Sequence, residues 1–174
     1  MIKLTHLYRK ILKDYQSIHI SVDMTCGKGN DTLFLSEISK KVYSFDIQKN
    51  AINKAKELTK NKDNIIYICD NHEHILKYIQ EKIDVAIYNL GYLPGGNKDI
   101  KTTASTTIHS LKSLMTILND SGIIIIEVYP HNKEESLALD HYITNLDHTF
   151  DVLKIDLYNK VNPPYLIVIK KALK

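Results

Sequence analysis

The sequence predicts an α/β fold, a doubly wound and largely parallel sheet of seven strands with helices on both faces. Short apolar strands alternate with amphipathic segments along most of the chain, a pattern typical of right-handed β–α–β crossovers. Residues 83–90 are almost continuously apolar, as expected of a strand buried on both faces. Residues 151–158 and 165–170 flank Pro163-Pro164 and predict a hairpin, so the last strand should be antiparallel.

The other elements follow from the spacing of apolar residues. One face of a helix over residues 3–14 collects Leu4, Leu7, Tyr8, Ile11 and Leu12. Further strands are expected at residues 18–23, 41–46, 65–69 and 123–128, and further helices at 31–39, 49–60, 72–80, 106–118 and 133–146. Residues 91–102 should form a loop, and the Gly-bearing run 119–122 should end a helix. Because there is no internal repeat or linker, residues 1–174 are expected to form one domain.

The composition is that of a globular domain without a membrane span. The chain has 174 residues, 44% of them apolar and 25% charged, enough to bury one core without a metal or disulfides. Neither a signal-peptide pattern nor an apolar run of about 18 residues is present, and Cys26 and Cys69 are too few for a disulfide framework. A cytoplasmic location is therefore expected. The net charge of +3 permits a nucleic-acid partner without requiring one.

The loop after the first strand has the pattern of a nucleotide-type cofactor site. Asp23 closes that strand and Gly27-Lys28-Gly29 leads into a helix, where glycines allow the close approach of a ligand. A dinucleotide fingerprint would place a third glycine at position 32, but Thr32 is there. This argues against a nicotinamide cofactor. An acidic residue before G-x-G suits a cofactor with a methionine moiety, whose amino group a carboxylate can bind.

Polar residues also follow the second and third strands, where ligands bind in such sheets. Asp46, before Ile47 and Gln48, is expected to accept the ribose hydroxyls of an adenosine, although it would also suit the N-cap of the next helix. Asp70-Asn71-His72 lies where the adenine edge is expected. Asp70 or Asn71 could equally cap a helix, and His72 is better explained by packing or hydrogen bonding than as a catalytic base.

The segment Asn89 to Gly96, N-L-G-Y-L-P-G-G, is the most specific of all. A polar residue at the end of a buried fourth strand, followed by Gly and Pro, faces the reacting group in this architecture. A loop of this length in so small a domain is more often functional than a simple connection.

Together these segments resemble the family of small bacterial methyltransferases called putative rRNA methylases. The matching runs are D-M-T-C-G-K-G-N-D-T-L-F-L from Asp23, F-D-I-Q from Phe45, N-L-G-Y-L-P-G-G-N-K from Asn89 and T-T-I from Thr106. The resemblance implies a Rossmann-like class I methyltransferase that uses S-adenosylmethionine. It further implies transfer of a methyl group to the 5-aminomethyl amine of wobble uridine 34, often 2-thiolated, in tRNA.

The resemblance and the loop positions give a set of expected site residues. The cofactor should lie against Asp23, Thr25, Cys26, Gly27, Gly29, Asn30, Asp46, Ile47, Gln48, Asp70, Asn71, His72, Asn89, Leu90 and Gly91. The Asn89 side-chain oxygen, or a nearby backbone carbonyl, is expected to accept an amine N–H and aim the lone pair of the amine, with Tyr92 beside the base or the sulfonium. The substrate should contact Tyr92, Pro94, Gly95, Gly96, Lys98, Lys101, Thr103, Thr106, Thr107, His131 and Asn162.

Several alternatives stay open at this stage. The threonines could cap the helix near Thr106, and Asn162-Pro163-Pro164 could simply form a rigid turn. The expected partner is the anticodon stem-loop of tRNA, whose unpaired bases can be read on their edges. Ribosomal RNA, a protein or a small-molecule amine would suit the same chemistry, and a nicotinamide-binding module is a weaker alternative. A homodimer is expected, and no metal is required.

Overall fold

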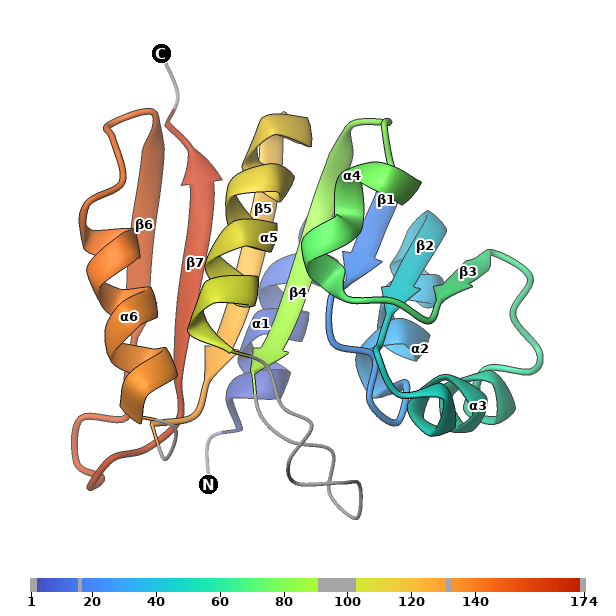
Figure 1. Ribbon diagram of the computed structural model, residues 1–174, viewed down its shortest axis with the longest axis horizontal. Coiled ribbons are helices and arrows are strands. Elements are labelled where there is room, and N and C mark those ends of the chain that lie inside the picture. The colour runs from blue at the N-terminus through green and yellow to red at the C-terminus, as the bar shows by residue number, and fades with distance from the viewer. Residues whose placement is uncertain (1–2, 16, 91–102, 131–132, 173–174) are drawn as a thin grey trace.

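The computed structural model describes residues 3–15, 17–90, 103–130 and 133–172. Within these ranges a seven-stranded sheet runs through the molecule in the order β3-β2-β1-β4-β5-β7-β6 (Figure 1). Its strands are β1 Ile18–Asp23, β2 Ser39–Phe45, β3 Ile65–Ile68, β4 Ile83–Leu90, β5 Leu118–Val128, β6 Phe150–Ile155 and β7 Tyr165–Lys171. The helices are α1 Leu4–Lys13, α2 Asn30–Ile38, α3 Lys49–Leu58, the 3-10 helix η1 His72–His74, α4 Ile75–Tyr78, α5 Ala104–Ile117 and α6 Lys133–Thr144.

The predicted topology is confirmed. Strands β1 to β5 pair in parallel, whereas β7 is antiparallel to both β5 and β6. The strand order reverses beside β1: the chain passes from β3, at one edge of the sheet, to β4, which lies next to β1 on the side away from β2. Ligands of doubly wound sheets bind at the carboxyl ends of the strands near such a reversal. The carboxyl ends of β1 and β4 therefore mark the place to look for a site.

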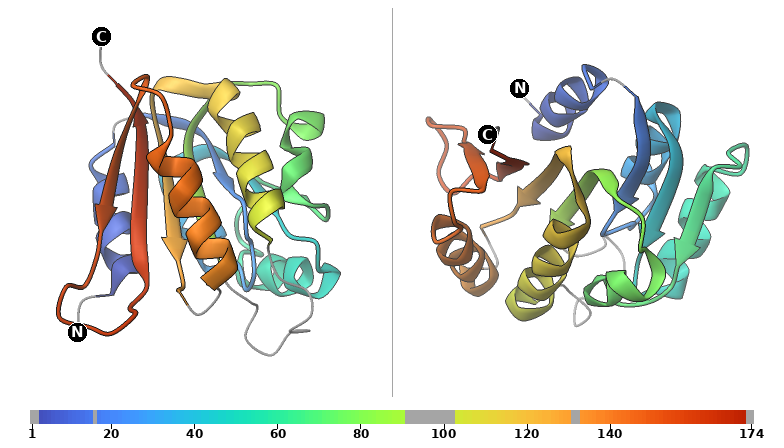
Figure 2. Two further views of the ribbon diagram at one scale, coloured as in Figure 1. Left: turned by 60° about the vertical axis from the view of Figure 1, so that its left-hand side comes forward. Right: turned by 90° about the horizontal axis from the view of Figure 1, so that it is seen from above.

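Two layers of helices cover the sheet. Figure 2 shows α1, α2 and α3 on one face and α4, α5 and α6 on the other. Alternate residues of β4 enter the two cores: Val85 and Ile87 pack with Leu12 and Leu35 on the α1 side, and Tyr88 packs on the α5 side. The continuous apolar run at residues 83–90 is thus explained by burial on both faces. No helix in the described part of the chain is long and apolar enough to cross a membrane.

Several predicted boundaries differ from the structure by two or three residues, β2 and β6 among them, and three further differences concern the elements around the site. The helix expected at 72–80 is shorter and divided into η1 and α4. Helix α5 begins at Ala104, two residues before the expected start, because Thr103 caps it. Strand β5 already begins at Leu118, and its register with β4 shifts between Ile83 and Val85. Residues 119–122, predicted to end a helix, therefore lie within β5, where its pairing with β4 is irregular.

Candidate active site

Polar side chains gather at the carboxyl ends of three neighbouring strands. Ile87 of β4 and Ile125 of β5 face the α1 side, and side chains two residues apart share a face. Asn89 and Glu127, which are cross-strand partners, therefore also lie on the α1 side. Asp23 ends β1 two residues after Ser21, opposite in direction to Val22 of the α5-side core. The sheet thus presents three polar side chains to the same helices.

The loop between β1 and α2 is held by a buried network around Asp23. The Thr32 hydroxyl donates to Asp23 Oδ2 over 2.6 Å, and the Thr25 backbone N–H donates to Oδ1 over 3.1 Å. Thr32 also lies 2.8 Å from the Ser44 hydroxyl. Burial, with a smaller contribution from the charge of Asp31, raises the pKa of Asp23 to about 7. Thr32, which replaces the third glycine of a dinucleotide fingerprint, therefore serves to fix this carboxyl.

Gly29 shapes the same loop by its backbone. It adopts a φ of +85°, and a Cβ built there would lie 2.7 Å from the Ala55 Cβ and 2.8 Å from the Ala55 Cα. Glycine is needed because the left-handed region strains other residues and because α3 approaches so closely. The sequence predicted that this glycine makes room for a ligand. The structure shows that it makes room for a neighbouring helix.

Asp46 follows β2 and reaches across to the β1 loop. Its Oδ2 accepts from the Gly27 backbone N–H over 2.9 Å, and its Oδ1 accepts from the Gln48 N–H over 2.8 Å. The carboxyl makes no cap bond to α3, whose N-cap is Gln48. Each carboxylate oxygen has a second lone pair, so this arrangement leaves acceptor capacity for two ribose hydroxyls. The donor set fits the nucleoside end of the predicted cofactor.

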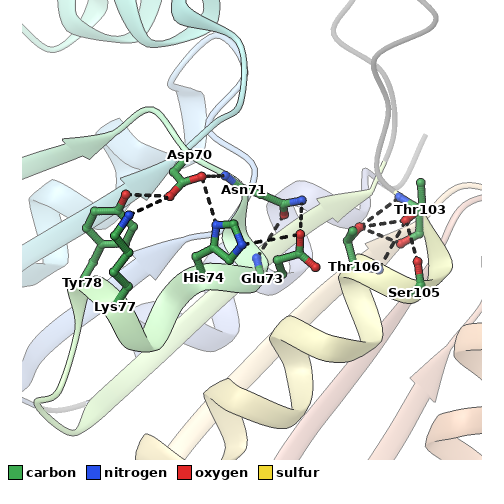
Figure 3. Close-up of polar contacts among 9 residues, drawn as sticks. All are labelled: Asp70, Asn71, Glu73, His74, Lys77, Tyr78, Thr103, Ser105 and Thr106. Carbon is green, nitrogen blue, oxygen red and sulfur yellow. Dashed lines mark hydrogen bonds and ion pairs between the residues drawn. The ribbon is translucent and has the colours of Figure 1, made fainter.

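The residues after β3 make a local polar cluster (Figure 3). Asn71 caps η1 by accepting from the Glu73 N–H. Asp70 accepts from the Tyr78 hydroxyl over 2.6 Å and lies 3.1 Å from His74 Nδ1. The Tyr78 bond is the main cause that lowers the pKa of Asp70 to about 2. The capping alternative therefore describes Asn71, and an adenine contact of Asp70 and Asn71 stays a prediction.

His72 lies in the core rather than among exposed groups. It is 6% exposed and packs edge-on against Tyr88, with ring centroids 5.8 Å apart. Burial lowers its pKa to about 4, although a hydrogen bond with the Met24 backbone acts in the opposite direction. A neutral, buried imidazole of this kind agrees with the packing role that the sequence favoured.

Asn89 connects the end of β4 to both neighbouring elements. Its backbone N–H donates to Thr25 Oγ1 over 2.8 Å, and its side-chain Nδ2 donates to Asp31 Oδ2 over 3.5 Å. Asp31 Oδ1 accepts from the Tyr8 hydroxyl over 2.7 Å and from Arg9 Nη2 over 2.8 Å. Helix α1 therefore reaches the predicted methyl-transfer position through Asp31.

Glu127 extends this network along β5. It is 5% exposed, and its carboxylate accepts from the Tyr129 hydroxyl over 3.1 Å and from Thr5 Oγ1 over 3.3 Å. Burial raises its pKa, with the neighbouring charge of Asp31 acting in the same direction. Neither Asp31 nor Glu127 was singled out from the sequence. For Glu127 the sequence does contain a signal, since an acidic residue directly follows the apolar run Ile123–Ile126.

The predicted substrate residues are distributed unequally. Thr103 and Thr106 form a reciprocal capping box at the start of α5, as the capping alternative proposed. Thr107 is fully buried and donates to Glu135, so its expected place on an RNA-binding surface is wrong. Asn162 is exposed, with a φ of +47°, in the turn between β6 and β7. Outside the described residues lie Gly91, Tyr92, Pro94, Gly95, Gly96, Lys98, Lys101 and His131.

The fold and the site together define a class of protein. A doubly wound sheet closed by an antiparallel hairpin, with carboxyls after β1 and β2 and an amide at the end of β4, is that of a Rossmann-like methyltransferase. The model of the family described as "Putative rRNA methylase" matches residues 42–170, and the chain belongs to this family. The predicted family and fold are thus confirmed, and so is the predicted enzyme class, that of the S-adenosylmethionine-dependent methyltransferases.

Relatives of this chain include solved structures and named proteins. A "putative methyltransferase" from Streptococcus mutans, in complex with SAH, is 35% identical with a TM-score of 0.92, and the match covers 99% of both chains. A "putative rRNA-methylase" from Clostridium thermocellum is 34% identical with a TM-score of 0.92, over 99% of this chain and 100% of that one.

A curated plant relative is longer. The chloroplastic "tRNA (mnm(5)s(2)U34)-methyltransferase" of Arabidopsis thaliana is 31% identical over 86% of this chain. The match spans 62% of the length of that relative.

Proposed function

We propose that this chain methylates the 5-aminomethyl amine of wobble uridine 34 in tRNA, with S-adenosylmethionine as methyl donor. The observation that carries the proposal is the placement of Asn89 at the end of β4, between the β1 loop and Asp31. The name of the plant relative supports the wobble amine as acceptor, and the SAH in the streptococcal relative supports the cofactor. The anticodon stem-loop is the proposed partner, since its bases are unpaired.

The donor set fits the nucleoside end of the cofactor. Asp46, oriented by the N–H groups of Gly27 and Gln48, would hold the ribose hydroxyls. Asp23 is fully buried and holds the β1 loop through the Thr25 N–H and the Thr32 hydroxyl, and its contact with the methionine moiety stays a prediction. When bound, S-adenosylmethionine supplies a methyl group already activated by a sulfonium. The remaining task of the protein is to align an unprotonated amine.

Asn89 is suited to that alignment. Its Oδ1 accepts no hydrogen bond from the residues that the structure describes, so it can accept an amine N–H. A protonated amine has no lone pair, and a site of low polarity favours the neutral form. Proximity and orientation alone can contribute about 7 to 11 kcal/mol in well-aligned reactions. Asn89 can therefore assist the reaction by aligning the amine, although its amide does not titrate.

Wobble nucleosides measured by mass spectrometry test the proposal. In a strain lacking the gene, the 5-aminomethyl nucleoside should accumulate and its methylated product should disappear. Complementation with the wild-type gene should restore the product, and complementation with Asn89→Ala should not. Persistence of the product in the deletion strain would contradict the tRNA assignment, and loss of a methylated ribosomal nucleoside instead would favour ribosomal RNA.

A homodimer is part of the proposed state of the protein. The turn between β6 and β7 carries two fully exposed large side chains, Tyr158 and Val161, at 102% and 93% exposure. Exposed apolar groups of this kind are common where proteins associate. Sedimentation at micromolar concentration should give the mass of two chains, and a monomer under those conditions would contradict the dimer.

A further inference from the structure

We propose that Asp31 is a positioning residue, which fixes the orientation of the Asn89 side-chain amide for the reaction. This inference rests on the proposed function, because it explains how Asn89 would present the correct atom to the amine. Asp31 stands in the first turn of α2, is 8% exposed, and its carboxylate receives bonds from α1 and β4.

The two oxygens of Asp31 have different partners. Oδ1 accepts from the Tyr8 hydroxyl over 2.7 Å and from Arg9 Nη2 over 2.8 Å, which fills its two lone pairs. Arg9 also donates to the Asn30 carbonyl and stacks on the Phe34 ring, 5.0 Å from its centroid. These contacts hold the carboxylate plane from the α1 side. Oδ2 is thereby left to face Asn89.

A carboxylate accepts hydrogen bonds and donates none. The amide of Asn89 must therefore turn its Nδ2 toward Asp31, and its Oδ1 must point the other way. The flipped amide would bring two acceptors together and leave a donor unsatisfied, which is unfavourable. The backbone of Asn89 is fixed independently by Thr25. Rotation of the side-chain amide by about 180° is therefore the main motion that Asp31 restricts.

The orientation matters because the proposed acceptor is an amine. A neutral amine donates its N–H to an acceptor and uses its lone pair for attack. An Oδ1 facing the amine accepts that N–H and directs the lone pair away from the amide. A flipped amide would present Nδ2, which would donate to the lone pair and block the attack. Asp31 thus contributes to the rate without touching the substrate.

A double-mutant cycle between Asp31→Asn and Asn89→Ala tests this coupling. In the wild-type background, Asp31→Asn should lower kcat by about 10-fold, within the range of couplings between contacting side chains. In the Asn89→Ala background it should lower kcat by less than about 2-fold, because the amide that it orients is gone. S-Adenosylmethionine affinity, measured by calorimetry, should change little in either background. Tyr8→Phe is the matched comparison: it removes one of the two bonds to Asp31 Oδ1 and spares Oδ2, so it should lower kcat by less than Asp31→Asn does.

The opposite outcomes are equally clear. Additive losses of kcat, or a loss of cofactor affinity in Asp31→Asn that persists in Asn89→Ala, would overturn the positioning role and assign Asp31 to the ligand. A readout without activity separates this inference from the proposed function. The NMR signals of the Asn89 side-chain amide, assigned by their absence in Asn89→Ala, should shift further in Asp31→Asn than in Tyr8→Phe. If the wild-type chain does not methylate the tRNA, the proposed function fails while this shift still decides the inference; an unchanged signal in Asp31→Asn contradicts it.

Discussion

The ends of β2 and β4 both carry a polar side chain, but the two are held in opposite ways. Asp46 accepts from two backbone N–H groups, one of them only two residues further along the chain. Asn89 is held by side chains, Thr25 and Asp31, which lie 64 and 58 residues away. The proposed nucleoside end of the site is therefore preformed by a turn. The proposed methyl-transfer end depends on how α1 and α2 pack against the sheet.

Both ends share the loop between β1 and α2, so the largest expected effect is at Gly29. Gly29→Ala should lower the free energy of unfolding by about 2 to 5 kcal/mol, from left-handed backbone strain and overpacking against Ala55. Urea unfolding measures it. Adding Ala55→Gly should recover only a fraction of the loss, because the Ala55 Cα, 2.8 Å from the built Cβ, remains. A Gly29→Ala variant as stable as the wild type would contradict the close approach of α3.

The comparison itself predicts a division of labour between Asp46 and Asn89. Asp46→Ala should weaken S-adenosylmethionine binding by about 10- to 100-fold, the value of one charge-assisted bond or more. Asn89→Ala should lower kcat by about 100-fold, the cost of a misaligned reactant, with little change in cofactor affinity. Calorimetry and single-turnover kinetics separate the two. Asp46→Asn, which keeps one acceptor oxygen, is the control, and equal losses of cofactor affinity in both alanine variants would remove the distinction.

Local sequence patterns were sufficient for the fold and for placing Asp46 at the end of its strand. The alternation of strands and helices predicted every strand and the antiparallel hairpin, because burial on one or both faces imposes its period on the sequence. Asp46 was singled out because it ends the second strand, one crossover helix after Gly29, and its role at the ribose stays a prediction. The boundaries of β5 and α5 were less predictable, since they depend on the pairing of Leu118 and the cap at Thr103.

The methyl-transfer end could be predicted only in part. The end of a buried strand pointed to Asn89, but nothing local showed that Asp31 would orient it. Tyr8 was correctly placed on the inner face of α1, yet its hydroxyl bond to Asp31 depends on how that helix docks. Thr107 was expected on the RNA-binding surface together with Thr103 and Thr106, while its burial against Glu135 comes from the packing of α5 on α6.

Asp23 offers a pH-dependent test of the preformed loop. Its pKa is about 7 in the folded protein, raised from 3.8 mainly by burial, so the folded state holds a proton that the unfolded state has lost between these values. The contribution of Asp23 to stability is thus present below about pH 4 and is lost as the pH rises to about 7. The wild type should therefore be most stable relative to Asp23→Asn at low pH, as measured by the free energy of unfolding. A difference that is constant from about pH 4 to 8 would show that Asp23 does not titrate in this range.

The smallest effect is expected at Thr103, outside both ends of the site. Its hydroxyl accepts from the Thr106 N–H over 3.3 Å, and the Thr106 hydroxyl lies 3.3 Å from the Thr103 N–H (Figure 3). Thr103→Ala removes the N-cap of a long helix and should lower the unfolding free energy by about 1 kcal/mol, whereas Thr103→Ser should retain most of it. RNA affinity, measured at one fixed salt concentration, distinguishes the cap from the substrate contact that the sequence suggested. If the serine variant is as stable as wild type and Thr103→Ala binds RNA normally, the hydroxyl serves the helix. A loss of RNA affinity without a loss of stability would instead extend the methyl-transfer end of the site to the start of α5.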